Sequence, residues 1–175
     1  MRIKPYFTTK RIAYLAILVA INVAINCFDI NMGSLKMTFS YIPCFIAGIF
    51  LGPVSGLIVG VLGDVLGMVI APKGAWIPLI TVSAGLIGLI PGLICMIKKL
   101  NIFVRIGISL VVVFVVCTAG LNTFALFQIM SRGRTFWVYL GGRIGPQAAV
   151  YAINAVIIFL LYPPLKKYVF KKEFA

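Results

Sequence analysis

Long apolar runs separated by short polar segments dominate this chain. Four of the runs approach or exceed the roughly 20 residues that a helix needs to cross the hydrocarbon core of a bilayer, namely residues 12–28, 77–97, 102–130 and 137–162. The connections between runs are too short for a soluble domain, so we predict a single membrane domain over residues 1–175. The first run leads to Cys27-Phe28-Asp29 instead of a small-residue cleavage site, so we expect it to be a span and not a signal peptide.

The region from Phe39 to Ala71 is too long for one ordinary span, and Gly52-Pro53 interrupts it. Proline lacks a backbone donor and restricts the residue before it, which favours a turn or break at this point. We therefore predict two short helices, residues 39–51 and 54–70, and six spans in total.

The distribution of basic residues tests this count, because cytoplasmic ends of spans carry the excess of Lys and Arg. With six spans, eleven of the 16 basic residues fall on the side of the two termini: Arg2, Lys4, Lys10, Arg11, Lys98, Lys99, Arg105, Lys166, Lys167, Lys171 and Lys172. With five spans, the clusters at the two ends of the chain would face opposite sides. We predict an all-α integral membrane protein of six transmembrane helices, multi-pass in the cell membrane, with both termini cytoplasmic.

Composition supports lipid as the solvent, since 62% of the residues are hydrophobic and only 11% are charged. The net charge of +13 does not indicate nucleic-acid binding, because the basic residues lie at the ends of apolar runs. The four cysteines occupy apolar stretches, and the chain has no histidine, so we expect buried thiols and no metal site. Because P-loop, HExxH and GxSxG motifs are also absent, we predict that the protein is not an enzyme and carries no cofactor.

Small residues recur every four positions in several spans. In the first span Ala16, Ala20 and Ala24 form a smooth face, and such faces allow close helix packing in lipid. This face could contact another helix of the same chain or a partner subunit. Two further ladders, one that begins at Gly52 and one of Ala84, Gly88 and Gly92, predict tight internal packing.

Asp64 lies in the middle of an apolar run, where a charged side chain is costly and should face the protein interior with a partner. Arg143 is the obvious cation, and Gln147 lies one turn further along the same helical face, with Asn154 two turns beyond. The two readings are a structural ion pair between Asp64 and Arg143 and a direct role in binding.

Basic and aromatic side chains gather on the predicted outer side. The cations are Lys36, Lys73, Arg132, Arg134 and Arg143, and the rings are Phe39, Tyr41, Trp76, Phe136, Trp137 and Tyr139. An anionic aromatic ligand would suit this combination, although an interfacial aromatic belt with a few basic residues has the same composition. Our candidate ligand-binding residues are Lys36, Phe39, Asp64, Lys73, Trp76, Tyr139, Arg143 and Gln147.

The chain resembles the substrate-binding S components of energy-coupling factor (ECF) vitamin transporters over nearly its whole length. The resemblance rests on size, six spans, the basic amino terminus that leads into residues 11–20, the glycine-rich segment 50–64, and Pro72-Lys73-Gly74-Ala75-Trp76 before the fourth span. It implies a binding protein whose alanine motif, here Ala16, Ala20 and Ala24, docks on a transmembrane coupling subunit that carries two ATPases. The ligand would lie near the outer face, under residues 29–38 and 71–76, and the whole protein would topple in the bilayer.

Within that family, residues 34–43 and the Arg143-xxx-Gln147 spacing are most similar to the folate-type group. Folate has a ring system that stacks on aromatics, a ring edge for Asp64 or Gln147, and carboxylates for basic residues. Pantothenate-type and pyridoxine-type S components remain alternatives, as does a stand-alone secondary carrier. The sparse acidic residues give a carrier no convincing ion-coupling site.

Overall fold

The computed structural model describes residues 8–28, 30–32, 35–37, 39–72, 76–97, 101–130 and 135–169. Its elements are α1 (Thr9–Phe28), β1 (Ile30–Met32), β2 (Leu35–Met37), α2 (Tyr41–Ile46), η1 (Ala47–Leu51), α3 (Pro53–Ile70), α4 (Pro78–Cys95), α5 (Ile102–Val113), η2 (Phe114–Asn122), α6 (Thr123–Met130), α7 (Phe136–Pro164) and η3 (Leu165–Val169). The three η segments are π-helical continuations of α-helices.

Within the described residues, five helices are long and apolar enough to cross a bilayer: Thr9–Phe28, Pro53–Ile70, Pro78–Met96, Ile102–Gln128 and Phe136–Lys167. A sixth apolar helix, Tyr41–Leu51, is shorter. The all-helical membrane fold expected from the sequence is therefore confirmed, with one addition. Strands β1 and β2 form an antiparallel hairpin in which Ile30 pairs with Met37, and the hydropathy pattern did not reveal it.

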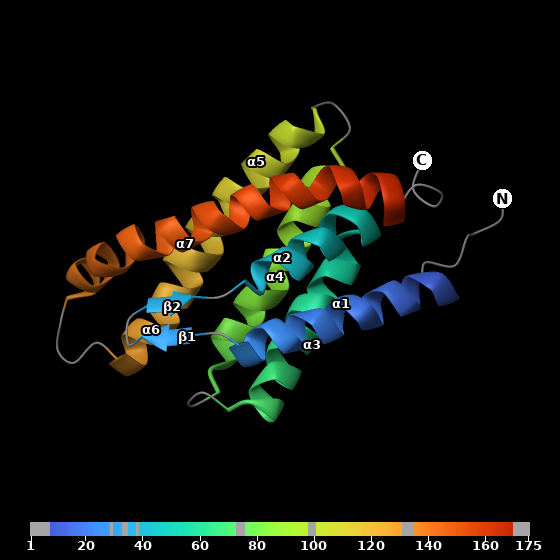
Figure 1. The fold of residues 1–175 in the computed structure, drawn as a ribbon. Coiled ribbons are helices and arrows are strands. Elements are labelled where there is room, and N and C mark those ends of the chain that lie inside the picture. The colour runs from blue at the N-terminus through green and yellow to red at the C-terminus, as the bar shows by residue number, and fades with distance from the viewer. Residues whose placement is uncertain are drawn as a thin grey trace.

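The start of α1 and the end of α7 lie at one end of the bundle, and the two strands, α6 and the end of α3 lie toward the other end (Figure 1). Strand β2 packs against α7. This arrangement brings the segments that carry the predicted ligand-binding residues to one end of the molecule.

Gly52 separates η1 from α3. Its φ angle of 99° lies in the region that only glycine adopts without strain, and Pro53 then starts α3, where its missing N–H costs no helical hydrogen bond. The chain can thus turn between two helices that run back against each other.

Helices α3 and α4 pack backbone to backbone. A Cβ atom added at Gly56 would collide with the carbonyl oxygen of Gly88, and one at Gly60 would collide with that of Ala84. Because lipid provides no hydrophobic force between helices, such close contact is what holds them together. The glycine ladders predicted from the sequence are the interface itself.

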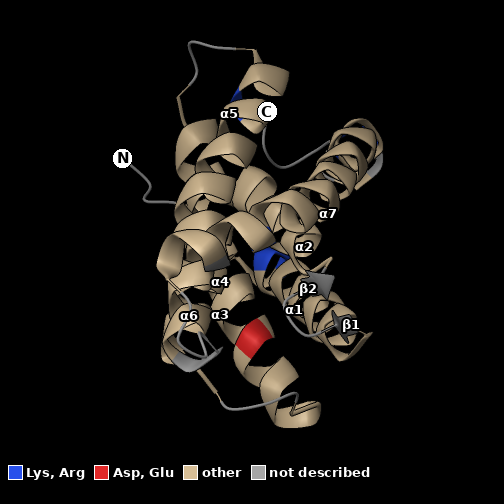
Figure 2. Cartoon of the chain, turned by 90° about the vertical axis from the view of Figure 1, so that its left-hand side faces the viewer, with Lys and Arg blue, Asp and Glu red and all other residues tan. Residues whose placement is uncertain are grey.

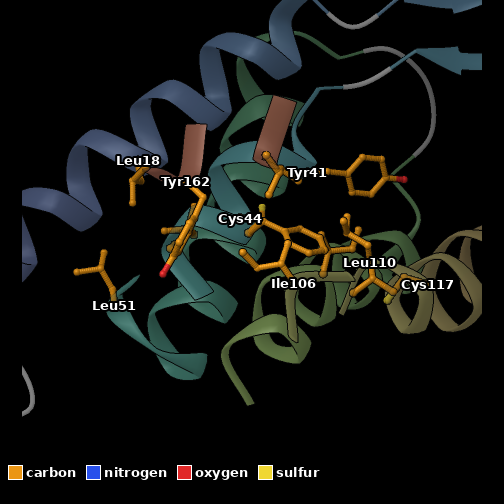
Figure 3. Packing of buried hydrophobic residues seen from close by; sticks show 14 of the residues in the cluster. Leu18, Tyr41, Cys44, Leu51, Ile106, Leu110, Cys117 and Tyr162 are labelled. Carbon is orange, nitrogen blue, oxygen red and sulfur yellow. The ribbon is translucent and has the colours of Figure 1, made fainter. Parts of the chain in front are cut away.

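The apolar core is built from buried side chains of all the long helices together with α2, η1 and η2. Side chains of Ile106, Leu110 and Cys117 from α5 and η2 point toward Tyr41 and Cys44 on α2 (Figure 3). Buried polar side chains lie among these apolar residues on several helices, including Asn22 on α1, Thr81 on α4 and Gln147 on α7.

Candidate ligand-binding site

A small hollow lies between η2, α6 and α7. It encloses a volume of about 10 Å³, roughly the room that one water molecule needs. Arg143 and Gln147, one turn apart on α7, both line it, and only 6% and 7% of their surfaces are exposed. The other lining residues are Phe114, Thr118, Ala119, Thr123 and Ile144.

The wall opposite α7 is built by the π-helical segment η2, a type of distortion that is common at functional sites. The Thr123 hydroxyl donates to the Thr118 carbonyl at 3.0 Å, and the hydroxyl oxygens of Tyr41 and Thr118 are 3.4 Å apart. Tyr41 meets Tyr151 edge to face, and the Tyr151 hydroxyl donates to the Leu110 carbonyl at 2.9 Å. Hydrogen bonds and ring contacts thus fix this wall.

The side-chain carbonyl oxygen of Gln147 is buried and has no hydrogen-bond partner among the described residues. Leaving such a buried acceptor unsatisfied costs about 1–3 kcal/mol, which a ligand N–H or O–H group would recover. The neighbouring Arg143 guanidinium presents a planar fork of donors that suits a carboxylate. The hollow therefore presents a cation and a hydrogen-bond acceptor to a polar group that reaches it.

A second polar cluster lies where α3 meets α4. The Trp76 indole N–H donates to the Thr81 hydroxyl oxygen at 3.0 Å, and that hydroxyl donates to the Asp64 carboxylate at 2.7 Å. Thr81 is buried, whereas Trp76 is 58% exposed. An acidic acceptor and an accessible indole ring are thus connected through one hydroxyl.

Asp64 is the acidic position on α3 (Figure 2) and does not form the ion pair that one reading of the sequence proposed. Its carboxylate bonds to Thr81 on α4, while Arg143 lines the hollow formed by η2, α6 and α7. The physical reason is that α3 packs on α1 and α4, and in the described part of the chain none of the well-packed helix pairs joins α3 to α7. Acid and cation are separate features of the site.

The other predicted residues are placed only in part. Phe39 lies two residues before the start of α2 and is 40% exposed. Lys36 belongs to β2, where it pairs with Asn31, and Tyr139 belongs to α7, but both side chains lie outside the described part of the structure. Lys73 also lies outside the described residues.

The alanine face of α1 is exposed along its whole length, at Ala13, Ala16, Ala20 and Ala24. Within the described residues, no helix of this chain covers it. Internal packing, one of the two readings of this ladder, is therefore not what the structure contains. The face is free for lipid or for a partner subunit.

The opposite face of α1 is held to α3 by asparagines. The Asn22 amide donates to the Val59 carbonyl at 3.0 Å, and the Asn26 amide donates to the Gly63 carbonyl at 3.3 Å. A Cβ atom at Gly63 would collide with the Asn22 side chain, so glycine is needed for this close approach. Two amides therefore fix the helix that exposes the alanines.

Sequence reasoning missed Thr81, Thr118, Thr123 and Asn22. Each is a polar residue inside an apolar run, which is the signal that identified Asp64 and could have identified these as well. Among the described residues, no group of three or more His, Cys, Asp or Glu side chains could hold a metal ion.

Comparison with known proteins identifies the class of the chain. Residues 6–168 match the family model for the S component of ECF-type riboflavin transporters. The folate transporter FolT of Clostridium novyi (strain NT) is 31% identical over 147 residues, which cover 83% of this chain and 84% of that protein. These relatives are subunits of transporters and not enzymes.

Two solved structures have the same fold. A crystal structure of FolT bound with folic acid superposes with a TM-score of 0.79 at 25% identity, covering 90% of this chain and 97% of that one. The S component of a bacterial ECF transporter gives a TM-score of 0.73 at 20% identity, covering 92% and 98%. The fold is thus that of a multi-pass membrane S component. The chain belongs to the family of ECF-type riboflavin transporter S components.

Proposed function

We propose that this chain is the high-affinity substrate-binding subunit of an ECF-type vitamin uptake transporter and that its ligand is folate. The observation that carries the proposal is the hollow lined by Arg143 and Gln147, which offers a cation and an unsatisfied acceptor at the same end of the bundle as Asp64 and Trp76. The similarity to FolT supports the choice of folate.

Folate matches these features better than its rivals do. A glutamate carboxylate of folate would pair with Arg143, its pterin ring would stack on an aromatic side chain, and the N–H edge of the ring would bond to Asp64 or Gln147. Riboflavin, after which the family model is named, has a ring with an N–H donor but no carboxylate. Pantothenate has a carboxylate and no ring, and pyridoxine has a ring and no carboxylate.

The ligand would extend well beyond the hollow. Pockets for small molecules typically enclose roughly 300–1,000 Å³, which is more than the space next to Arg143. A polar group at one end of folate would reach into the hollow, and the remainder would lie toward Trp76, which is exposed beside the Asp64 cluster. A single elongated ligand would then contact both polar clusters.

Energy for uptake would come from partners. The exposed ladder of Ala16, Ala20 and Ala24 would dock on a transmembrane coupling subunit, because small side chains allow helices to approach closely in lipid. Two ATPases on that subunit would supply the work. This chain would contribute ligand recognition.

Side-by-side titration tests the ligand. Purified protein is titrated with folate, riboflavin, pantothenate and pyridoxine while the emission of Trp76 and Trp137, the two tryptophans of the chain, is recorded. We expect saturable 1:1 quenching by folate, and mass spectrometry of small molecules extracted from the purified protein should identify the same compound. Saturation by riboflavin with no response to folate would contradict the assignment of folate as the ligand. It would not contradict the assignment of the chain as a transporter subunit.

A further inference from the structure

Thr81 uses its single hydroxyl twice. Its proton goes to Oδ2 of Asp64 at 2.7 Å, and its oxygen accepts the Trp76 indole N–H at 3.0 Å. A hydroxyl can donate one proton to an acceptor, and its oxygen can accept a hydrogen bond from a donor. The indole can only donate, and the carboxylate accepts. The direction of this chain of hydrogen bonds is therefore fixed.

The bond from Thr81 crosses between helices, which is not the local option for such a residue. A threonine inside a helix commonly returns its hydroxyl to the carbonyl four residues earlier. Thr81 instead reaches α3, although it is buried near the start of α4 and only 8% of its surface is exposed. Its position therefore determines where the carboxylate of α3 and the ring of Trp76 lie relative to each other.

We propose that Thr81 is a positioning residue of the ligand site, holding the Asp64 carboxylate and the Trp76 indole in one arrangement for a flat heteroaromatic ring. The inference rests on the proposed function. Within the described residues, Thr81 is the one hydrogen-bond donor to the Asp64 carboxylate, and it engages Oδ2. Oδ1 is then left for an N–H donor at the edge of a ligand ring, while the indole offers an apolar face beside it.

The arrangement selects a chemical class of ligand. A ring with N–H donors at one edge, as in pteridines, can bond to the carboxylate and contact the indole at the same time. A ligand without such an edge gains only one of these contacts. Thr81 itself would not touch the ligand, so its effect should pass through the other two side chains.

The test uses the full-length protein with Trp137→Phe, which leaves Trp76 as its tryptophan. In this background Thr81→Val removes the hydroxyl and keeps the shape of the side chain, and Thr81→Ser restores the hydroxyl. In ligand-free protein, we expect the valine variant to lower the fluorescence anisotropy of Trp76 and the serine variant to return it. We expect folate to dissociate about fivefold faster from the valine variant, the loss of one typical hydrogen bond, and at the original rate from the serine variant.

Ser109→Ala is the matched control, because that buried hydroxyl donates to the Arg105 carbonyl on α5, away from Trp76. It should change neither readout. Thr81→Ala, which also lacks the hydroxyl, serves if Thr81→Val does not fold, and Trp76→Phe removes the indole N–H. Trp76→Phe should also accelerate folate release. In the double variant, Thr81→Val should accelerate release less than it does alone, because the two side chains act together.

Unchanged anisotropy and unchanged folate release in Thr81→Val would overturn the inference, as would failure of Thr81→Ser to restore both. If the parent protein does not bind folate, the proposal that folate is the ligand is wrong. The anisotropy of ligand-free Trp76 still decides whether Thr81 positions the indole.

Discussion

The two sides of α4 are built differently. Toward α3 the interface consists of backbone and glycine, with Gly56 against Gly88 and Gly60 against Ala84. Toward η2 the partner of α4 is a π-helical segment, and η2 in turn forms the hollow with Arg143 and Gln147 on α7. One side has no room for a methyl group, and the other leaves space and an unsatisfied acceptor.

We interpret the α3 side of α4 as the source of stability and the η2 side as the region that binds ligand. Close backbone packing drives helix association in lipid, so the glycine side provides the scaffold. Buried polar atoms without partners cost free energy, so the η2–α7 side carries a cost that a ligand can recover. If this comparison is right, substitutions on the two sides should change different measurements.

The largest effect is expected on the glycine side, from Gly60→Ala. The added Cβ would meet the Ala84 carbonyl oxygen, which is backbone and cannot move away without separating α3 from α4. We expect a loss of at least about 2 kcal/mol of stability, in the range for overpacked cores, and little monodisperse protein in detergent. Size-exclusion chromatography and thermal unfolding measure both.

Gly107→Ala is the control for that change. Gly107 lies in α5, and a Cβ atom there would have nothing within 4 Å. Replacing glycine by alanine in an open helical position should leave stability unchanged or raise it by up to about 1 kcal/mol. Equal behaviour of the two variants would show that the α3–α4 contact is not what holds the scaffold.

The next prediction concerns the small residues of α1, which face outward, in contrast to the glycines of α3 and α4. Ala20→Trp enlarges the exposed face of α1 while Asn22 and Asn26 still hold α1 to α3. We expect folate uptake by the complete transporter to be abolished, with folate affinity of the isolated chain nearly unchanged, because the bulky ring keeps the coupling subunit away. Uptake assays paired with titration test this prediction, and an equal loss of binding would contradict it.

Hydropathy and spacing were sufficient to predict most of the helices. The break at Gly52-Pro53 and the packing of the glycine ladders follow from local rules, because a positive φ angle and close backbone approach each require glycine. The β1–β2 hairpin was missed because three-residue strands have too few positions to show an alternating pattern. The π-helical geometry of η2 also leaves no mark on apolar periodicity.

The site was predictable as a set of residues but not as an arrangement. Asp64, Arg143 and Gln147 stand out as polar groups in apolar runs, yet the sequence did not indicate that Asp64 bonds to Thr81 on α4 while the other two line a hollow with η2. Charge complementarity suggested pairing, and helix packing decides against it. The bond from Thr81 to Asp64 joins residues 17 positions apart, a pairing that depends on how α3 and α4 meet.

At the interface of η2 and α7, Arg143→Ala should lower the affinity for folate more than tenfold, about 1.4 kcal/mol. The reason is that a carboxylate loses a charge-assisted contact. Arg143→Lys should recover part of the affinity, since lysine keeps the charge but not the planar fork. Arg105→Ala is the control, because its guanidinium donates to the Cys95 carbonyl at the C-terminal end of α4. An unchanged dissociation constant for Arg143→Ala would show that the folate carboxylate does not bind at this hollow.

The smallest effect, and the one with opposite signs, is expected from Gln147→Leu. Leucine has nearly the same volume and removes a buried oxygen that has no hydrogen-bond partner among the described residues, so the ligand-free protein should keep or gain stability. Folate, however, would lose the acceptor for one of its N–H groups. We expect affinity to fall about threefold to tenfold, the value of one hydrogen bond, while the unfolding temperature stays equal or rises. Titration and thermal unfolding of the same preparation measure the two quantities together. A fall in both would mean that Gln147 supports the fold and not the ligand, and the division between the two sides of α4 would then fail at this residue.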